Sequence, residues 1–161
     1  MTLRPATPDD AALVCELIRE LAAYEKACAD DVKTTSAAIA EALAPDAEPR
    51  LSALLAFDGE DPVGLALFYP AYSTWRANWG VHLEDLFVRP AHRGKGFGLA
   101  LFRAVAAEAV ARGADRLDWV VLNWNQLAID FYDGLGAEAQ REWTGMRLSG
   151  EALARLAEAA E

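Results

Sequence analysis

The sequence has few of the features that mark secreted, metal-binding or membrane-spanning proteins. Cys15 and Cys28 are its only cysteines, too few for a disulfide scaffold and without the paired spacing of a zinc site. The segment Met1 to Pro5 has no apolar stretch behind a basic start, and no run of about 18 uncharged residues occurs. We therefore expect a cytoplasmic protein with no membrane span and no bound metal. Cys15 lies within an apolar helical stripe, which predicts a small buried hydrophobe.

Positive charge is also scarce. The chain has 15 Lys and Arg against 25 Asp and Glu, which gives a net charge of −10. A nucleic acid or an anionic membrane surface would repel such a body, whereas small cations are permitted as ligands. No internal repeat or low-complexity segment interrupts the 161 residues, of which 53% are hydrophobic. These features predict one globular domain over residues 1–161.

Helix signals are clear in the first part of the chain. Thr7-Pro8-Asp9-Asp10 predicts a helix start, with Thr7 as the cap and Asp10 in the acidic position of a capping box. Apolar residues then recur at spacings of three and four, so this helix is expected to continue to about Glu25. A shorter helix is expected from about Thr35 to Ala44, because Pro45 follows it.

The rest of the chain predicts strands alternating with helices. The expected elements are strands at Leu51 to Phe57 and Val63 to Tyr69, joined by the five-residue turn Asp58 to Pro62; a long polar and aromatic loop; a strand at Val81 to Val88; a helix at Leu99 to Ala111 closed by Gly113; a buried strand at Leu117 to Leu122; a helix at Asn125 to Leu135 ending at Gly136; a strand pair around Ala139 to Leu148; and a helix from about Gly150. Preceded by an N-terminal strand, this order predicts an α/β sandwich of a mixed sheet and helices.

The most informative segment is Arg93-Gly94-Lys95-Gly96-Phe97-Gly98, between a strand and a helix. Alternate glycines let the backbone approach a ligand, and the amides of such a loop and of the following helical turn converge on an anion such as phosphate. A P-loop is excluded because no Gly-Lys-Ser/Thr follows, and the glycine spacing does not fit a dinucleotide fingerprint. The alternative is a glycine-rich turn without chemical use.

Two motifs in this part of the chain resemble those of the GCN5-related N-acetyltransferases. Arg93, Gly96 and Gly98 match that family's Arg/Gln-x-x-Gly-x-Gly/Ala signature, and Asn125, followed by Ile129, Phe131, Tyr132 and Gly136-Ala137, resembles its second signature. The resemblance implies a mixed, mostly antiparallel sheet flanked by helices, with acetyl-CoA in a cleft between splayed central strands. The residues that it implies for cofactor binding are Leu86, Phe87, Val88, Arg93, Gly94, Lys95, Gly96, Phe97, Gly98, Asn125 and Tyr132.

A narrower resemblance is to the spermidine/spermine branch of this family, which includes thialysine acetyltransferases. It rests on Arg4-Pro5-Ala6-Thr7, on Glu20 to Glu25, on Leu83 to Val88 and on Trp124-Asn125. The branch implies transfer of an acetyl group from acetyl-CoA to a primary amine of a polyamine, a diamine or a thialysine-like amino acid. It also implies a homodimer, to which the C-terminal strand and helix contribute. The alternatives are an acetyltransferase for an aminoglycoside, an amino acid or a protein N-terminus, and a non-catalytic acyl-CoA sensor.

Acetyl transfer to an amine needs a base, because an alkyl amine with a pKa near ~10.4 is protonated at neutral pH. Glu84 is the predicted base by resemblance, with Asp85 assisting. Neighbours on a strand point to opposite faces, so only one of the two should face a cleft unless a bulge intervenes. The resemblance implies Tyr132 as the general acid for the leaving thiolate. A backbone amide of Leu86, Phe87 or Val88 would stabilise the developing oxyanion, and the sequence does not distinguish among them.

Recognition of a cationic acceptor would combine carboxylates with aromatic faces. The candidate substrate-binding residues are Tyr24, Glu25, Tyr72, Trp75, Glu84 and Asp85. No catalytic role is assigned to His82 or His92, which are expected to be ordinary packed or exposed histidines.

Overall fold

The computed structural model describes residues 1–48 and 51–158, and the chain divides into two units, Met1–Val120 and Val121–Glu161. Among the described residues, the first unit contains one sheet in the order β1-β2-β3-β4-β5. Neighbouring strands are antiparallel except for the parallel pair β4 and β5, which confirms the mixed, mostly antiparallel sheet. The strands are β1 (Thr2–Pro5), β2 (Ser52–Asp58), β3 (Asp61–Ser73), β4 (Asn78–Val88) and β5 (Leu117–Trp119).

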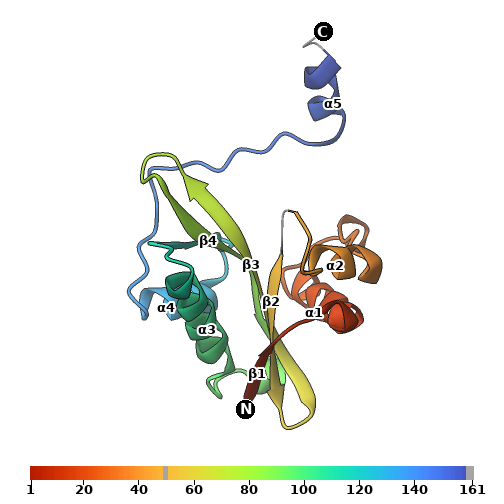
Figure 1. Ribbon diagram of the computed structural model, residues 1–161, viewed down its shortest axis with the longest axis vertical. Helices are drawn as coiled ribbons and strands as arrows, with labels where there is room; N and C mark the ends of the chain where they lie inside the picture. Colours follow the sequence, from red (N-terminus) through yellow and green to blue (C-terminus); the bar gives the residue numbers. More distant parts are fainter. Residues whose placement is uncertain (49–50, 159–161) are drawn as a thin grey trace. The chain divides into compact units, whose positions relative to one another are not determined.

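Helices cover both faces of this sheet (Figure 1). The helices α1 (Ala11–Tyr24) and α2 (Ser36–Ala42) pack on one face, and α3 (Phe97–Ala111) packs on the other. The predicted start of the first helix is confirmed. A short 3₁₀ turn, Pro8–Asp10, leads into α1, and the Asp10 carboxylate accepts hydrogen bonds from the Thr7 backbone amide at 2.8 Å and from the Thr7 hydroxyl at 3.1 Å. The Arg4 guanidinium holds the same carboxylate through two further hydrogen bonds of 2.7 and 2.8 Å.

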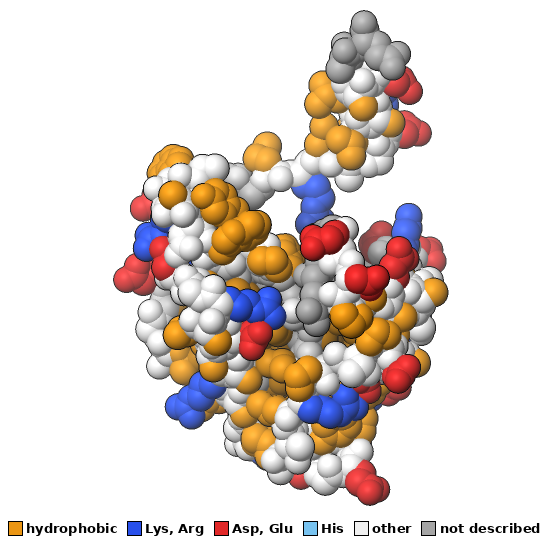
Figure 2. All heavy atoms as spheres, in the orientation of Figure 1, with side chains coloured by type: hydrophobic (Ala, Val, Ile, Leu, Met, Phe, Trp, Pro, Cys, Tyr) orange, Lys and Arg blue, Asp and Glu red, His pale blue; other side chains and the backbone are white. Residues whose placement is uncertain are grey.

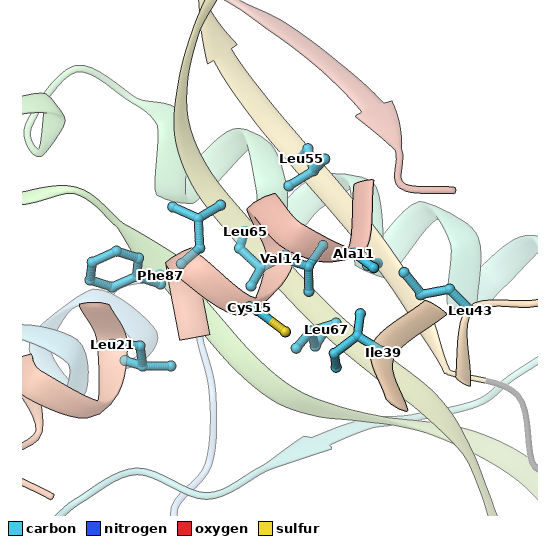
Figure 3. Packing of buried hydrophobic residues seen from close by; sticks show 12 residues of the cluster. Ala11, Val14, Cys15, Leu21, Ile39, Leu43, Leu55, Leu65, Leu67 and Phe87 are labelled. Carbon is cyan, nitrogen blue, oxygen red and sulfur yellow. The ribbon is translucent and has the colours of Figure 1, made fainter. Parts of the chain in front are cut away.

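Alternation along β3 divides the apolar core into two layers. Leu65 and Leu67 pack against α1 and α2, whereas Ala66 and Phe68 pack against α3. Figure 3 shows the first layer, in which side chains of α1 and α2 lie over the two central strands. Cys15 is completely buried there, as its helical position predicted.

The two predicted loops, between β2 and β3 and between β3 and β4, are both too long. The strands extend beyond their apolar runs and include residues that were predicted to be loop. Asp58 pairs with Asp61 across a two-residue turn in which Gly59 takes a φ of 65°. Pro62 is accommodated in β3 because the ladder shifts register opposite it, between Ala56 and Phe57. The expected polar and aromatic loop is instead the outer part of the β3–β4 hairpin. It is extended to Ser73 and Asn78 by residues that include the cross-strand pair Tyr72 and Trp79, whose rings lie 5.1 Å apart.

Two strand predictions near the C-terminus also fail. β5 ends at Trp119 rather than at Leu122, because only three of its residues pair with β4. None of these three residues is fully buried, so the expected buried strand is not found. No strand forms around Ala139 to Leu148 within the described residues. The apolar side chains of this segment are exposed, as Trp143 and Met146 show. Its backbone hydrogen bonds are local, as in Trp143 N–H to the Gln140 carbonyl at 3.3 Å, so an apolar pattern without a partner strand does not produce a ladder.

The two helices predicted for the second unit are confirmed as α4 (Gln126–Asp133) and α5 (Gly150–Glu158). Helix α5 is amphipathic, and in Figure 2 its apolar atoms gather on one side and its acidic atoms on the other. Leu153 and Leu156 on this helix are both exposed. No helix in the described part of the chain combines the length and the apolar content needed to cross a membrane.

Candidate active site

A β-bulge in β4 brings the two predicted carboxylates to one face of the sheet. Leu67 of β3 pairs with Asp85 and Phe68 pairs with Leu83, so Glu84 is an extra residue without a partner in this ladder. Asp85 lies on the α1 face, because its partner Leu67 belongs to the α1 core layer. Glu84 is on the same face, where it accepts a hydrogen bond from the hydroxyl of Tyr69. Strand alternation would place these two carboxylates on opposite faces, and the bulge is what brings them to the same face.

Glu84 has two polar neighbours that the sequence did not single out. The Tyr69 hydroxyl donates a hydrogen bond of 3.3 Å to Glu84 Oε2, and His82 Nε2 lies 3.8 Å from the same oxygen. The rings of Tyr69 and His82 pair across the two strands with centroids 5.1 Å apart. Burial raises the pKa of Tyr69, and the negative charge of Glu84 raises it further. Half of the Glu84 side chain is exposed, at 53%, so its carboxylate is open to solvent or to a ligand.

Asp85 is half-buried and is surrounded by negative charge. Burial raises the pKa of its carboxyl from 3.8 to about 6, and the charges of Glu84 and Glu25 add to this shift. Glu25 follows the last residue of α1, and burial raises its pKa as well. No side chain of the described residues donates a hydrogen bond to the Asp85 carboxylate. Three carboxylates thus lie near one another on the α1 face, and the most buried of them lacks a hydrogen-bond donor, which a cationic ligand would supply.

The glycine loop presents backbone amides without internal partners. Gly94 and Gly96 have φ angles of 74° and 88°, and Gly96 is the N-terminal cap of α3. Among the described residues, no amide from Gly94 to Leu99 donates a hydrogen bond to another residue. A Cβ added at Gly94 would meet nothing within 4 Å, so the space beside this backbone is open. The loop therefore fits the phosphates of a nucleotide, with the exposed Lys95 side chain as a nearby cation.

Two of the predicted cofactor-binding side chains are directed into the protein. Phe97 is buried in the α3 core layer, so only its backbone is available to a ligand. The Arg93 guanidinium lies over the ring of Tyr24, with Cζ 4.2 Å from the ring centroid, and its Nε donates a hydrogen bond of 2.9 Å to the Val88 carbonyl. Arg93, which the resemblance places among the cofactor-binding residues, therefore uses its Nε and one face of its guanidinium within the protein.

The backbone of β4 also distinguishes among the predicted amide donors. The Arg89 amide donates to Val63 of β3, and successive amides along a strand point to opposite edges. The amide of Phe87 therefore points to β3, and those of Leu86 and Val88 point to the β5 side. The pairing with β5 stops at Leu83, so β4 continues beyond its parallel neighbour and the two strands part at this level.

Asn125 and Tyr132 belong to the second unit. Asn125 is buried and caps α4, where its side chain accepts a hydrogen bond of 3.3 Å from the Ala128 amide. Tyr132 is half-buried in the last turn of α4, and its ring packs edge-on against Phe131 at 5.2 Å. The Tyr132 carbonyl accepts a hydrogen bond from Ala137 in the turn that Gly136 allows by its φ of 83°.

The two predicted aromatic residues of the long hairpin are not brought together with the carboxylates. Tyr72 alternates with Phe68 and so lies on the α3 face of β3, opposite to Glu84, and it contacts Trp79. Trp75 lies in the turn between β3 and β4 and is 87% exposed.

Comparison with known proteins identifies the family to which this chain belongs. Residues 16–137 match the model of the acetyltransferase (GNAT) family, a region that includes the bulge, the glycine loop and Asn125. The chain belongs to this family. It is 38% identical over 156 residues to a thialysine N-epsilon-acetyltransferase of Caenorhabditis elegans, with 94% of each chain covered. It is 36% identical over 173 residues to the protein of that name from Bos taurus, with 96% of each covered.

The fold is also found in solved structures. The integron cassette protein VCH_CASS6 from the mobile metagenome of V. cholerae superposes with a TM-score of 0.79 at 25% identity. The alignment covers 98% of this chain and 97% of that one. The α/β GNAT fold is thus shown, and this member of the family is an acetyltransferase, whose family uses acetyl-CoA as the acetyl donor.

Proposed function

We propose that this enzyme transfers the acetyl group of acetyl-CoA to a primary amine of a small cationic molecule, with thialysine and similar amino acids as the first candidates. The observation that carries this proposal is the group of three carboxylates, Glu25, Glu84 and Asp85, beside the parting strands β4 and β5. A protonated amine would supply the counter-charge that Asp85 lacks. The names of the relatives from C. elegans and Bos taurus support thialysine as an acceptor. Polyamines and diamines share the amine group and stay alternatives.

The glycine loop and β4 are proposed to hold acetyl-CoA, which supplies an acetyl group activated as a thioester. The unengaged amides from Gly94 to Leu99 would bind its pyrophosphate. The amides of Leu86 and Val88, which point away from β3, would donate hydrogen bonds to the thioester oxygen as negative charge develops there. Phe87 is the weaker candidate of the three, because its amide faces β3. Asn125 is proposed to order the start of α4, in the segment that resembles the family's pantetheine site.

The carboxylates are proposed to prepare the amine for direct attack. Asp85 and Glu25 would hold the ammonium form, and Glu84 would accept its proton, directly or through water. Tyr69 and His82 are positioned to orient the Glu84 carboxylate for this step. Tyr132 is proposed to donate its hydroxyl proton to the departing sulfur and to regain a proton from solvent, a role that rests on the family resemblance of its helix. Direct attack is proposed because neither cysteine has the setting of an activated nucleophile: Cys15 is completely buried, and Cys28 is an exposed residue that lies outside the proposed site.

The test is release of CoA from acetyl-CoA in the presence of thialysine, spermidine, 1,3-diaminopropane, an aminoglycoside and a peptide N-terminus. We expect the highest kcat/KM with thialysine or a polyamine, and a loss of about 10²-fold in kcat for Glu84→Gln. The matched control is Glu48→Gln, a change of the same kind at an exposed position of the first unit. Faster acetylation of the aminoglycoside or the peptide would contradict the acceptor class. Binding of acetyl-CoA without turnover on any amine would favour the sensor.

A homodimer and a cytoplasmic location stay predictions from the sequence. The family resemblance supports the dimer, and light scattering at micromolar concentration measures it directly. A monomeric mass under these conditions would contradict the dimer. Two free cysteines, with no disulfide among the described residues, agree with a reducing compartment.

A further inference from the structure

We infer that Arg93 is a positioning residue for the amine acceptor: its guanidinium fastens the end of α1, which Glu25 directly follows, to the end of β4. This inference rests on the proposed function, because it concerns how the acceptor site of that reaction is held together. It assigns to the side chain of Arg93 a role different from the phosphate contact that its place in the glycine loop predicts.

The contacts of Arg93 join three elements of the first unit. Its Nε donates a 2.9 Å hydrogen bond to the carbonyl of Val88, the last residue of β4. Its guanidinium carbon lies 4.2 Å from the ring centroid of Tyr24 and 5.9 Å from that of Phe87. Tyr24 is the last residue of α1, and Arg93 itself lies three residues before the Gly96 cap of α3. One planar cation therefore connects the end of α1, the end of β4 and the cofactor loop.

Tyr24 is the point at which this connection reaches the acceptor site. Glu25 follows Tyr24 directly, and its charge acts on Asp85 of β4. One turn before Tyr24, Glu20 accepts hydrogen bonds of 2.7 to 3.1 Å from Arg89, which hold the penultimate turn of α1 to the end of β4. The last turn of α1 is fastened to the loop by the Arg93 and Tyr24 contact. Loss of this contact is expected to let Glu25 shift relative to Asp85, although Leu21 in the same turn stays anchored in the core.

Arg93 acts by holding α1 in place and not through a direct effect of its charge on the carboxylates. Its charge is not among those that shift the pKa of Glu25 or Asp85. Its Nε is used by the Val88 carbonyl, and one face of its guanidinium is covered by the Tyr24 ring. The same contact covers one face of Tyr24, which was predicted to receive the substrate's cation. Lys95, which is exposed, is the loop's cation with an accessible side chain.

The experiment is a double-mutant cycle on Arg93→Met and Tyr24→Leu, with thialysine and acetyl-CoA as substrates. We expect each single variant to raise KM for thialysine at least about tenfold while the Kd for CoA, measured by calorimetry, changes less than about threefold. The double variant should be no worse than the poorer single variant, because both changes remove the same contact. Arg103→Met is the matched control: this exposed arginine on α3 undergoes the same chemical change and should leave both constants unaltered.

Several outcomes would overturn the inference. If Arg93→Met weakens CoA binding and leaves KM for thialysine unchanged, the side chain is a phosphate ligand. Tyr24→Leu keeps Arg93 intact, so an unchanged KM for thialysine in this variant contradicts the positioning role even if Arg93→Met does not fold. Additive effects in the double variant would show that the two side chains act separately. Failure of the proposed function is a different result, because there the wild-type protein would acetylate none of the amines.

Discussion

Asp85 is the side chain for which the structure makes the sharpest prediction of pH dependence. Its pKa is raised from 3.8 to about 6, so the folded state holds the proton more tightly than the unfolded state does. The free energy of unfolding therefore falls as the pH rises from about 4 to above 6. Asp85→Asn removes this cost. We expect the variant to be more stable by about 1–2 kcal/mol at pH 8, because partial exposure reduces the full effect of the shift.

The measurement is urea denaturation of both proteins at pH 4 and at pH 8. At pH 4 the difference should nearly vanish, since Asp85 is then protonated in the folded wild type. Asp46→Asn, at an exposed position, controls for the general loss of one negative charge. A gain in stability that is equal at both pH values would disprove the assignment of this pH effect to Asp85. Acetyl transfer should fall in the same variant, because Asp85 is proposed to hold the ammonium group of the acceptor.

Tyr132 allows a test of the general acid by a change of one atom. Tyr132→Phe keeps the ring that packs against Phe131 and removes the hydroxyl. If the hydroxyl donates a proton in the transition state, kcat should fall about 10²-fold while KM for acetyl-CoA stays within about threefold. Steady-state kinetics at saturating amine measures both. A normal kcat would assign the leaving-group proton to water or to another residue.

At the scale of the elements, the glycine loop contains two glycines with different structural roles, one with a left-handed backbone and one within a helix. Gly96 has a φ of 88°, in which an L-residue is strained, so Gly96→Ala should lower the free energy of unfolding by about 1–2 kcal/mol. Gly98 lies within α3, and its added Cβ would be 3.7 Å from Val88 Cγ2, an ordinary contact. Gly98→Ala should therefore raise stability by about 0.5–1 kcal/mol through helix propensity. Thermal unfolding compares the two variants, and equal effects would contradict the left-handed role of Gly96.

The sequence predicts those elements whose signals are local. Thr7 and Asp10 lie three residues apart and predict the start of α1, and Gly113, with a φ of 74°, ends α3 as expected. The length of the β3–β4 hairpin was missed, because it depends on pairing between residues such as Tyr72 and Trp79 rather than on an apolar run. The strand pair near Ala139 was predicted from apolar residues alone and is absent from the described chain.

The candidate site shows the same limit at greater distances along the chain. The adjacent carboxylates Glu84 and Asp85 are visible in the sequence, but the bulge that turns both to one face depends on the register with β3. Tyr69 reaches Glu84 only through that register. The contact of Arg93 with Tyr24 joins residues far apart in sequence, and no spacing rule predicts it. Motif matching therefore finds the residues, and the pairing of elements decides what each side chain can do.

For the molecule as a whole, the excess of acidic groups produces a long-range negative electrostatic potential rather than a single binding site. The net charge is −10, and the face shown in Figure 2 carries acidic side chains scattered among apolar ones. Such a field raises the local concentration of cations and speeds their encounter with the protein. The three carboxylates Glu25, Glu84 and Asp85 add a local, partly buried source of negative potential at the candidate site. The two components differ in their response to salt, because exposed charges are screened more strongly than buried ones.

This difference predicts how ionic strength affects acceptors of unequal charge. At saturating acetyl-CoA, kcat/KM for spermidine, with about three positive charges at neutral pH, should fall several-fold between roughly 0.02 and 0.3 M NaCl, since the Debye length then shrinks to well under 10 Å. For thialysine, with a net charge near +1, the decrease should be much smaller. Both acceptors would use the same carboxylates, so a difference in slope reports the long-range field. Equal slopes would show that only the contacts within the site attract the amine, and that the charge elsewhere on the chain has no part in its capture.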